Sequence, residues 1–255
     1  DTFNIDKNIT SGSWDFNTIS SNDLKGFQAL DYLLNKRGLT EIERITYYTN
    51  SQNARDYMNA ISDELVTNIA YVVREWSTYK NDFISDFTTN ANGSSVSEMI
   101  NSMCLDYEFF VRRGKLGLPL GIFDLFSNDP LPELVECLHY GQSLPFIKRS
   151  VESLQKYING IHYSSNENGI GFDDYMNFVN ATNNNENLSS EVNSKFDLIL
   201  TNLNTLNDPL SSELVTNNSQ VNLAYDAMQN LVPYIKVDMT SALGVLITYA
   251  DNDGD

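Results

Sequence analysis

The chain has 255 residues, which is enough to bury one large hydrophobic core or two smaller ones. Its 16 Lys and Arg residues against 34 Asp and Glu residues give a net charge of −18. This charge argues against phosphate backbones and anionic lipid surfaces as partners, because both need clustered cations. It fits a protein that meets cations or simply stays dispersed.

The sequence also lacks the features of several other classes of protein. No run reaches the roughly 18 apolar residues of a transmembrane helix, and no secretory signal is present in the sequence. The two cysteines, Cys104 and Cys137, form no C-x-x-C motif and no zinc-binding spacing. They either pair as a disulfide in an oxidising compartment or remain two buried thiols.

The first 21 residues predict an irregular segment. They are rich in Asn, Thr, Ser and Asp, with apolar residues scattered among them. We therefore expect aromatic side chains, and no helix, to hold this segment in place.

A helix is predicted over 26–34, with Asn22 or Asp23 able to cap its start by accepting a first-turn amide hydrogen. Apolar residues recur three, four or seven apart on one stripe: Leu24, Phe27, Leu30, Leu33 and Leu34. Gln28 and Asp31 lie three apart beside this stripe. They either belong to a binding site or hydrogen-bond a neighbouring helix, because buried polar groups need partners.

A long helix is predicted over 51–87. Its apolar residues advance by three or four every time: Met58, Ile61, Leu65, Ile69, Val72, Trp76, Tyr79 and Phe83. A helix of this length spans about 50 Å, which suits a long bundle. Ser95 and Glu98 then form a capping box that opens another helix, ending near Gly114.

The sequence at 117–121 predicts a break, since Pro119 lacks an amide hydrogen and glycines flank it. We expect two domains to meet here, 1–121 and 122–255. Apolar periodicity then predicts further helices, with a kink at Pro233 in the last of them: 133–140, 143–160, 171–181, 188–206 and 219–239. Strand-like alternation of useful length does not occur, so the predicted class is all-α, with two tandem helical bundles.

Four passages, in this order, resemble the imelysin-like family of bacterial periplasmic and cell-surface proteins. They are G-F-Q-A-L-D-Y-L-L (26–34), R-R-G-K-L-G-L-P-L-G (112–121), E-L-V-E-C-L-H-Y-G-Q-S-L (133–144) and I-T-Y-A-D-N-D-G-D (247–255). The first resembles the family's G-x-H-x-x-E motif, with Gly26, Gln28 and Asp31 at its glycine, histidine and glutamate.

The resemblance implies a pair of related helical halves with a ligand site where they meet. It also implies a protein of the periplasm or outer cell surface, often on a lipid anchor, that is associated with iron uptake. Relatives usually carry more helix before the motif, so we expect the first helices and an export signal to be missing from this sequence.

The resemblance also suggests which residues bind a ligand: Gly26, Gln28, Asp31, Arg112, Arg113, Glu136 and Ser143. A divalent metal (iron, zinc or calcium) would be held by Asp31, Glu136 and His139, the last of which lies one turn from Glu136. Glutamine is a poorer ligand for transition metals than histidine. A calcium site or another ligand therefore stays open, as does a structural role in which Gln28 and Asp31 bond to Arg112 or Arg113.

Three functions follow from these observations. The first is an exported, non-enzymatic protein that binds iron, haem or another small ligand during uptake, and the second is a divergent metallopeptidase. The sequence disfavours the second, because it holds neither H-E-x-x-H nor G-x-S-x-G. The third is a surface protein that binds a partner protein and has lost the metal site.

The ending, with Asp251, Asp253 and Asp255, is either a calcium ligand set or a solvated acidic tail.

Overall fold

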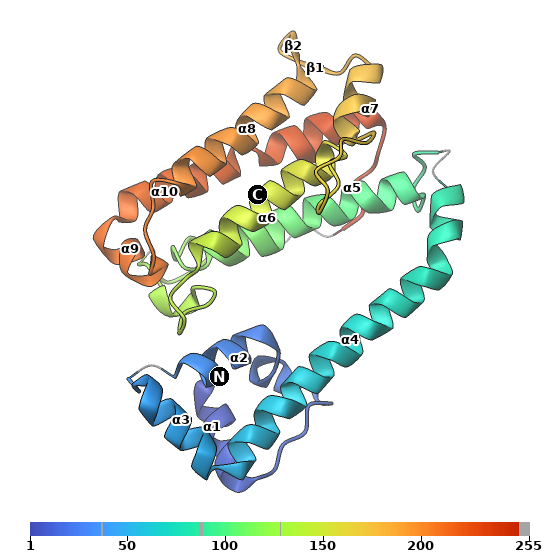
Figure 1. Ribbon diagram of the computed structural model, residues 1–255. Helices are drawn as coiled ribbons and strands as arrows, with labels where there is room; N and C mark the ends of the chain where they lie inside the picture. Colours follow the sequence, from blue (N-terminus) through green and yellow to red (C-terminus); the bar gives the residue numbers. More distant parts are fainter. Residues whose placement is uncertain (37, 87–88, 128, 250–255) are drawn as a thin grey trace. The chain divides into compact units, whose positions relative to one another are not determined.

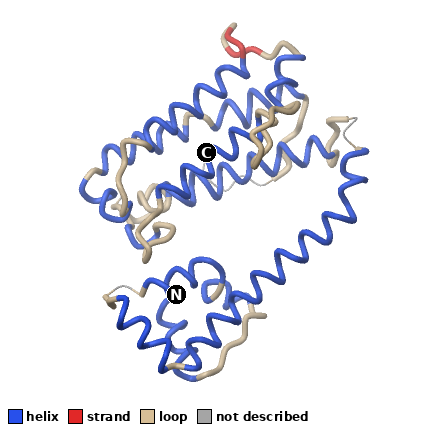
Figure 2. The backbone as a smooth tube through the Cα atoms, viewed as in Figure 1, coloured by secondary structure: helices blue, strands red, loops and turns tan. Residues whose placement is uncertain are grey.

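Helices make up most of the chain, as the sequence predicts (Figures 1 and 2). The computed structural model describes residues 1–36, 38–86, 89–127 and 129–249. The chain folds into two compact units. Unit 1 comprises Asp1–Asn81 and Glu136–Gly141, and unit 2 comprises Asp82–Val135 and Gln142–Asp255. The domain boundary at Gly121 stays a prediction.

Unit 1 is built from short helices around the first part of a long one. Its elements are α1 (Thr2–Ser11), the 3-10 helix η1 (Ile19–Leu24), α2 (Gly26–Asn35), α3 (Glu41–Asn50) and most of α4 (Gln52–Ser85). Their apolar faces meet in one small core: Ile5, Ile9, Ala29, Leu33, Ala54, Tyr57 and Ile61.

The helix α1 corrects the expectation of an irregular start. Asp1 caps it by accepting a hydrogen bond from the amide of Asn4 at 3.2 Å, and Gly12 ends it in a left-handed conformation. Ile5 and Ile9 lie four apart and are both buried, so two isoleucines supply the apolar stripe. The prediction was wrong because it weighed the polar composition above this single i, i+4 pair.

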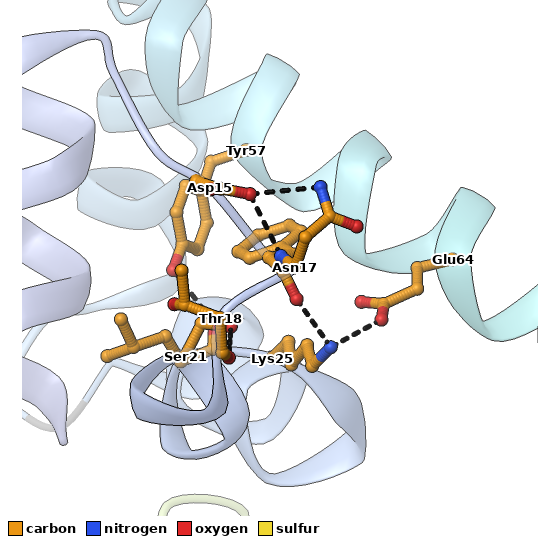
Figure 3. A network of polar contacts seen from close by, with 9 residues as sticks. Asp15, Asn17, Thr18, Ser21, Lys25, Tyr57 and Glu64 are labelled. Atoms are coloured by element: carbon orange, nitrogen blue, oxygen red, sulfur yellow. Dashed lines mark hydrogen bonds and ion pairs between the residues drawn. The ribbon is translucent and has the colours of Figure 1, made fainter.

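A polar network fixes the segment between α1 and α2 onto α4 (Figure 3). Lys25 donates to the Phe16 carbonyl at 2.8 Å and to Glu64 of α4 at 2.6 Å. The hydroxyl of Tyr57 donates to the Leu24 carbonyl at 2.7 Å, and Trp14 and Phe16 pack edge-on against the Tyr57 ring. The start of α2 is therefore held by an ion pair on one side and by aromatic packing on the other.

The predicted long helix is confirmed as α4, but only its first part is buried. Ala54, Tyr57 and Ile61 are inaccessible to solvent, whereas Ile69 and Val72 are 57% and 63% exposed. The apolar period that predicts the helix therefore continues beyond the region where it packs into the core of unit 1.

Unit 2 is a layered arrangement of helices around α8 (Figure 1). After the end of α4 its elements are, in order, α5 (Ser95–Leu105), the π-helical η2 (Asp106–Gly117), η3 (Pro132–Leu134), α6 (Leu144–Ile158), α7 (Phe172–Phe178), β1 (Thr182–Asn183), β2 (Glu186–Asn187), α8 (Leu188–Leu203), α9 (Leu210–Thr216), α10 (Asn218–Gln229), η4 (Tyr234–Met239) and α11 (Thr240–Leu243). The two strands pair antiparallel, with Thr182 opposite Asn187.

Several predicted elements of unit 2 are confirmed and others are wrong. The helices expected at 143–160 and 188–206 correspond to α6 and α8, and the short helix opened by Gly171 corresponds to α7. The helix expected over 219–239 is interrupted next to the predicted kink at Pro233, between α10 and η4, since Pro233 has no amide hydrogen to offer the carbonyl four residues before it. The helix expected to end near Gly114 continues in π geometry to Gly117.

Buried polar groups fasten the end of the described chain to the core of unit 2. The Asn101 side chain donates to the Leu246 carbonyl at 2.9 Å and accepts from the Thr248 amide at 2.8 Å. Glu108 pairs with Lys236 at 3.0 Å and accepts from the Tyr249 hydroxyl at 3.1 Å. The residues after α11 are thus held as an extended segment. The predicted acidic tail, with Asp251, Asp253 and Asp255, lies outside the described residues.

Candidate functional site

The helix α2 presents the motif residues within unit 1. Gly26 begins it with a φ of +79°, a conformation that residues with a Cβ atom avoid. Ala29 and Leu33 face the core, and Asp31 is also buried, with 8% of its surface exposed. Gln28 lies one turn before Asp31 and is exposed. Glycine at the motif's first position is therefore explained by backbone geometry.

The carboxylate of Asp31 is fully engaged with backbone and amide donors. One oxygen accepts the amide hydrogen of His139 at 2.9 Å, and the other accepts that of Tyr140 at 2.9 Å. The side chain of Asn35 donates to the second oxygen at 3.0 Å. Hydrogen bonds to a charged acceptor are stronger than neutral ones, so Asp31 ties α2 firmly to the segment that carries these amides.

This segment, Glu136–Gly141, is a tight turn and not the predicted helix. Cys137 has a φ of +53°, which is uncommon for a residue with a Cβ atom, and Gly141 has a φ of +75°. The amide of Gly141 donates to the Cys137 carbonyl at 2.8 Å and closes the turn. The helix prediction for 133–140 was wrong because the amides of His139 and Tyr140 bond to Asp31, where an α-helix would direct them to carbonyls four residues earlier.

Two weaker contacts extend this attachment. The Cys137 amide donates to the side-chain oxygen of Gln28 over 3.4 Å, close to the limit of a hydrogen bond. The rings of Tyr32 and His139 meet edge to face, with centroids 5.1 Å apart. Gln28, Asp31 and Tyr32 thus all contact the same turn from successive positions of α2.

Tyr32 is in turn held by an ion pair at its hydroxyl. Its O–H donates to Asp6, whose other oxygen pairs with Lys36 at 2.7 Å. The Lys36 ammonium also lies over the rings of Tyr32 and Tyr47, at 5.1 and 4.5 Å. Burial, and then the hydrogen bond to Asp6, raise the pKa of Tyr32 above its usual value. The phenol therefore stays protonated and keeps its role as a donor.

The other predicted site residues fall in two groups. Glu136 lies in the same turn as Cys137 and His139 and belongs to unit 1, whereas Arg112, Arg113 and Ser143 belong to unit 2.

Within unit 2, Arg112 is 2% exposed and donates to Gln229 and to the Tyr225 hydroxyl. Arg113 stacks over the ring of Phe123, 4.8 Å from its centroid. Both arginines therefore take part in the packing of unit 2.

Ser143 marks a contact that the sequence does not reveal. Its amide and that of Leu144 donate to the carboxylate of Asp208, at 3.0 and 3.2 Å. Asp208 thereby satisfies amides at the start of α6, as a capping side chain would. No local pattern points to it, because 65 residues separate Asp208 from Ser143.

Comparison with known proteins identifies the family of this chain. The family model for imelysin matches residues 2–235. The chain belongs to the imelysin family. No curated protein and no solved structure matches it. Within the part of this imelysin-family chain that the structure describes, none of the helices is long and apolar enough to cross a membrane.

The residues at the motif position do not fit a transition metal. Among the described residues, no group of three or more His, Cys, Asp and Glu side chains lies close enough together to hold a metal ion. Asp31 has both oxygens bonded to amide hydrogens, and Gln28 offers an amide oxygen in place of the imidazole that iron and zinc favour. Calcium would require six to eight oxygen ligands. In this imelysin-family chain the contacts of Asp31 attach the motif helix to the turn at Glu136–Gly141.

Cys104 and the second histidine lie outside this arrangement, whereas Cys137 belongs to the turn itself. Both cysteines are present as thiols, and that of Cys104 is buried and directed at the Ile235 carbonyl, 3.7 Å away. Burial raises the pKa of the Cys104 thiol to about 12, so it is unreactive at neutral pH. His162 is in an exposed loop, where its Nδ1 contacts the hydroxyls of Ser164 and Ser165.

Proposed function

We propose that this chain is a non-catalytic, exported binding protein of the imelysin family. In it the helix of the G-x-H-x-x-E motif anchors a neighbouring turn and holds no transition metal. Membership of the family supports export to the periplasm or outer cell surface and a role connected with iron or metal acquisition. The two tandem helical bundles expected from the sequence are part of the same proposal.

One observation carries the proposal that the motif is structural. Both oxygens of Asp31 accept amide hydrogens from the turn at Glu136–Gly141, at 2.9 Å each. A metal ion at this carboxylate would compete with these bonds, and the loss of either would leave a partly buried amide without an acceptor. Such an amide costs about 1–3 kcal/mol. An Asp side chain is shorter than the Glu of the motif, and its length suits bonds to the His139 and Tyr140 amides close to α2.

Metal analysis of protein purified without chelator tests this proposal. We expect far less than one equivalent of iron or zinc per chain, before and after dialysis against either ion. The double variant Gln28→His, Asp31→Glu places the family's residues at both positions and is the matched comparison. Metal bound by this variant alone would support loss of an ancestral site. Stoichiometric iron or zinc in the unmodified chain would overturn the proposal.

Peptide hydrolysis is the alternative, since the family model carries the name of a peptidase. The test is incubation with casein and with insulin, with and without added zinc. We expect no cleavage beyond that of a mock purification. Cleavage that disappears in the Asp31→Asn variant would establish the alternative and place the reaction at this helix.

A further inference from the structure

A cavity of about 460 Å³ lies within unit 2, away from every residue discussed as a site above. Its lining comes from α5, α6, α7 and the segments that precede α5 and α7 (Figure 1). The residues are Thr89, Asn90, Val96, Met99, Tyr157, Gly160, Ile170, Gly171, Phe172 and Tyr175. This volume falls within the range of about 300–1,000 Å³ found for small-molecule sites in proteins.

The lining selects against charged ligands. None of its described residues is Lys, Arg, His, Asp or Glu, so a phosphate, a carboxylate or a metal ion would lose its hydration without gaining a partner of opposite charge. The rings of Tyr157, Phe172 and Tyr175 and the thioether of Met99 supply apolar contact. Aromatic rings and thioethers both pack well against aromatic ligands. The amide of Asn90 and the hydroxyl of the exposed residue Thr89 add polar groups to this lining, beside the hydroxyls of the two tyrosines.

The walls of the cavity are fixed by contacts that do not need a ligand. The Tyr157 hydroxyl donates to the Met99 carbonyl at 3.2 Å, and the Tyr157 ring lies 5.9 Å from that of Phe172. A Cβ atom on Gly171 would lie 2.4 Å from the Ile158 carbonyl oxygen, so only glycine allows the two backbones to approach this closely. Asn90 is held by a 2.7 Å bond to the Leu243 carbonyl. A cavity shaped in advance binds with a smaller loss of entropy.

We propose that this cavity is a binding site for a small, uncharged molecule with an aromatic body. Tyr157 remains neutral there, because burial raises its pKa above the usual value. The inference goes beyond the function proposed above. It uses residues of unit 2 only, whereas Asp31 and its turn belong to unit 1, so either can fail without the other.

Two dyes with the same ring system and different charge test this proposal. N-phenyl-naphthylamine is uncharged, and anilinonaphthalene sulfonate adds one sulfonate to the same skeleton. The titrations are run in about 0.5 M NaCl, where the screening length falls to about 4 Å, so that the net charge of the chain does not itself repel the anion. We expect saturable binding of one equivalent of the uncharged dye and at least tenfold weaker binding of the sulfonate. Equal affinity for both dyes, or no saturable binding, would overturn the proposal.

A variant that fills the entrance locates the bound dye. Thr89 is exposed and lines the cavity, so Thr89→Trp places a large ring beside it, with loss of the hydrogen bond that the Thr89 hydroxyl accepts from the Ala91 amide. Thr201 on α8 is exposed and outside the lining, and Thr201→Trp is the matched control. We expect the first variant to weaken binding of the uncharged dye at least tenfold and the second to leave it unchanged. Unchanged binding in both would place the dye elsewhere and contradict the proposal.

A second pair of variants serves if Thr89→Trp does not fold. Ile170 is 92% exposed at the rim, and Phe178 is 82% exposed and outside the lining. Ile170→Asp adds a charge to the mouth of the cavity, and Phe178→Asp adds one to the same unit. The proposal requires Ile170→Asp to weaken dye binding several-fold more than Phe178→Asp does. Equal effects of the two would refute it.

Discussion

Asp31 stands at the position of the motif's glutamate and contacts a distant segment of the chain. Its carboxylate accepts two amide hydrogens from a turn more than a hundred residues later in the chain. An aspartate does this well because its short side chain keeps the oxygens near the helix surface. In the function proposed above, the position that the family resemblance assigns to a metal ligand fixes the path of the backbone.

Replacing Asp31 by Asn should destabilise the chain. The new amide group would turn a donor toward one of the two backbone amides and leave it without an acceptor, at a cost of about 2 kcal/mol. Urea unfolding followed by circular dichroism measures this loss. Asp23→Asn makes the same change at an exposed carboxylate just before α2 and should alter the unfolding free energy by less than about 0.5 kcal/mol. Equal effects of the two variants would mean that the bonds to the turn contribute nothing.

The sequence can predict some of the contacts of Asp31 and not others. Asn35 follows Asp31 by four positions, a spacing that places their side chains together on a helix. The amides of His139 and Tyr140 cannot be predicted this way, because backbone donors leave no mark in the sequence. The apolar and polar pattern at 133–140 even favours a helix, since it does not record that Cys137 takes a left-handed conformation.

At the scale of elements, helix ends are set by a few side chains. The start of α3 carries a complete capping box, in which the Thr40 hydroxyl accepts from the Glu43 amide and Glu43 accepts from the Thr40 amide. The sequence T-E-I-E contains this signal, although the apolar pattern around it is weak. The start of α3 could therefore be predicted from its capping box and not from the periodicity of its apolar residues.

The capping box should make part of the stability dependent on pH. The hydrogen bond from the Thr40 amide, and then that from its hydroxyl, hold the pKa of Glu43 below the usual value of a glutamate. Because the pKa of Glu43 is lower in the folded state than in the unfolded state, its ionisation stabilises the fold at pH values above the unfolded pKa. This contribution disappears as the pH falls through the folded pKa. The Glu43→Gln variant should therefore be less stable than the unmodified chain at pH 7 and should approach it near pH 3. Thermal unfolding at both pH values measures the difference.

Glu41→Gln is the control for this experiment. It removes the same charge from the same exposed turn of α3 without touching the capping box. A pH dependence as large in Glu41→Gln as in Glu43→Gln would show that the helix dipole, and not the box, is responsible.

The helix α4 separates helix formation from burial. Its apolar residues keep a helical period along its whole length, yet Ile61 is fully buried and Ile69, two turns later, is 57% exposed. Ile61→Ala should cost about 2–4 kcal/mol because it leaves a cavity in the core of unit 1. Ile69→Ala should change the unfolding free energy by less than about 0.5 kcal/mol. Chemical unfolding of the two variants measures both values, and a cost at Ile69 comparable to that at Ile61 would contradict the burial described here.

At the scale of the whole molecule, the helical class follows from the sequence and the grouping of the helices does not. Periodicity predicts α4, α6 and α8 with nearly the observed bounds. It misses α9, which has only seven residues, too few to establish a period. The turn at Glu136–Gly141 groups with residues far before it, and such long-range contacts have no local signature.

Limited chymotrypsin digestion tests the domain boundary predicted at Gly121. Leu125 and Phe126 are 93% and 96% exposed in the loop just after it, so we expect the first cut there. The fragments should remain associated in gel filtration, because Tyr107 lies against Phe196 and donates to the Met228 carbonyl in the core of unit 2. Fragments that separate would instead mean that the segments before and after Gly121 make no stable contact with each other.

The route of the chain has a consequence for how it folds as it is made. Unit 1 begins at Asp1, is left at Asn81 and receives its last piece only at Glu136–Gly141. On the ribosome, the amides that satisfy Asp31 therefore emerge long after α2 itself. Until then this carboxylate must be hydrated or accept from other donors, so the attachment of α2 is completed only after a segment more than a hundred residues later has been translated.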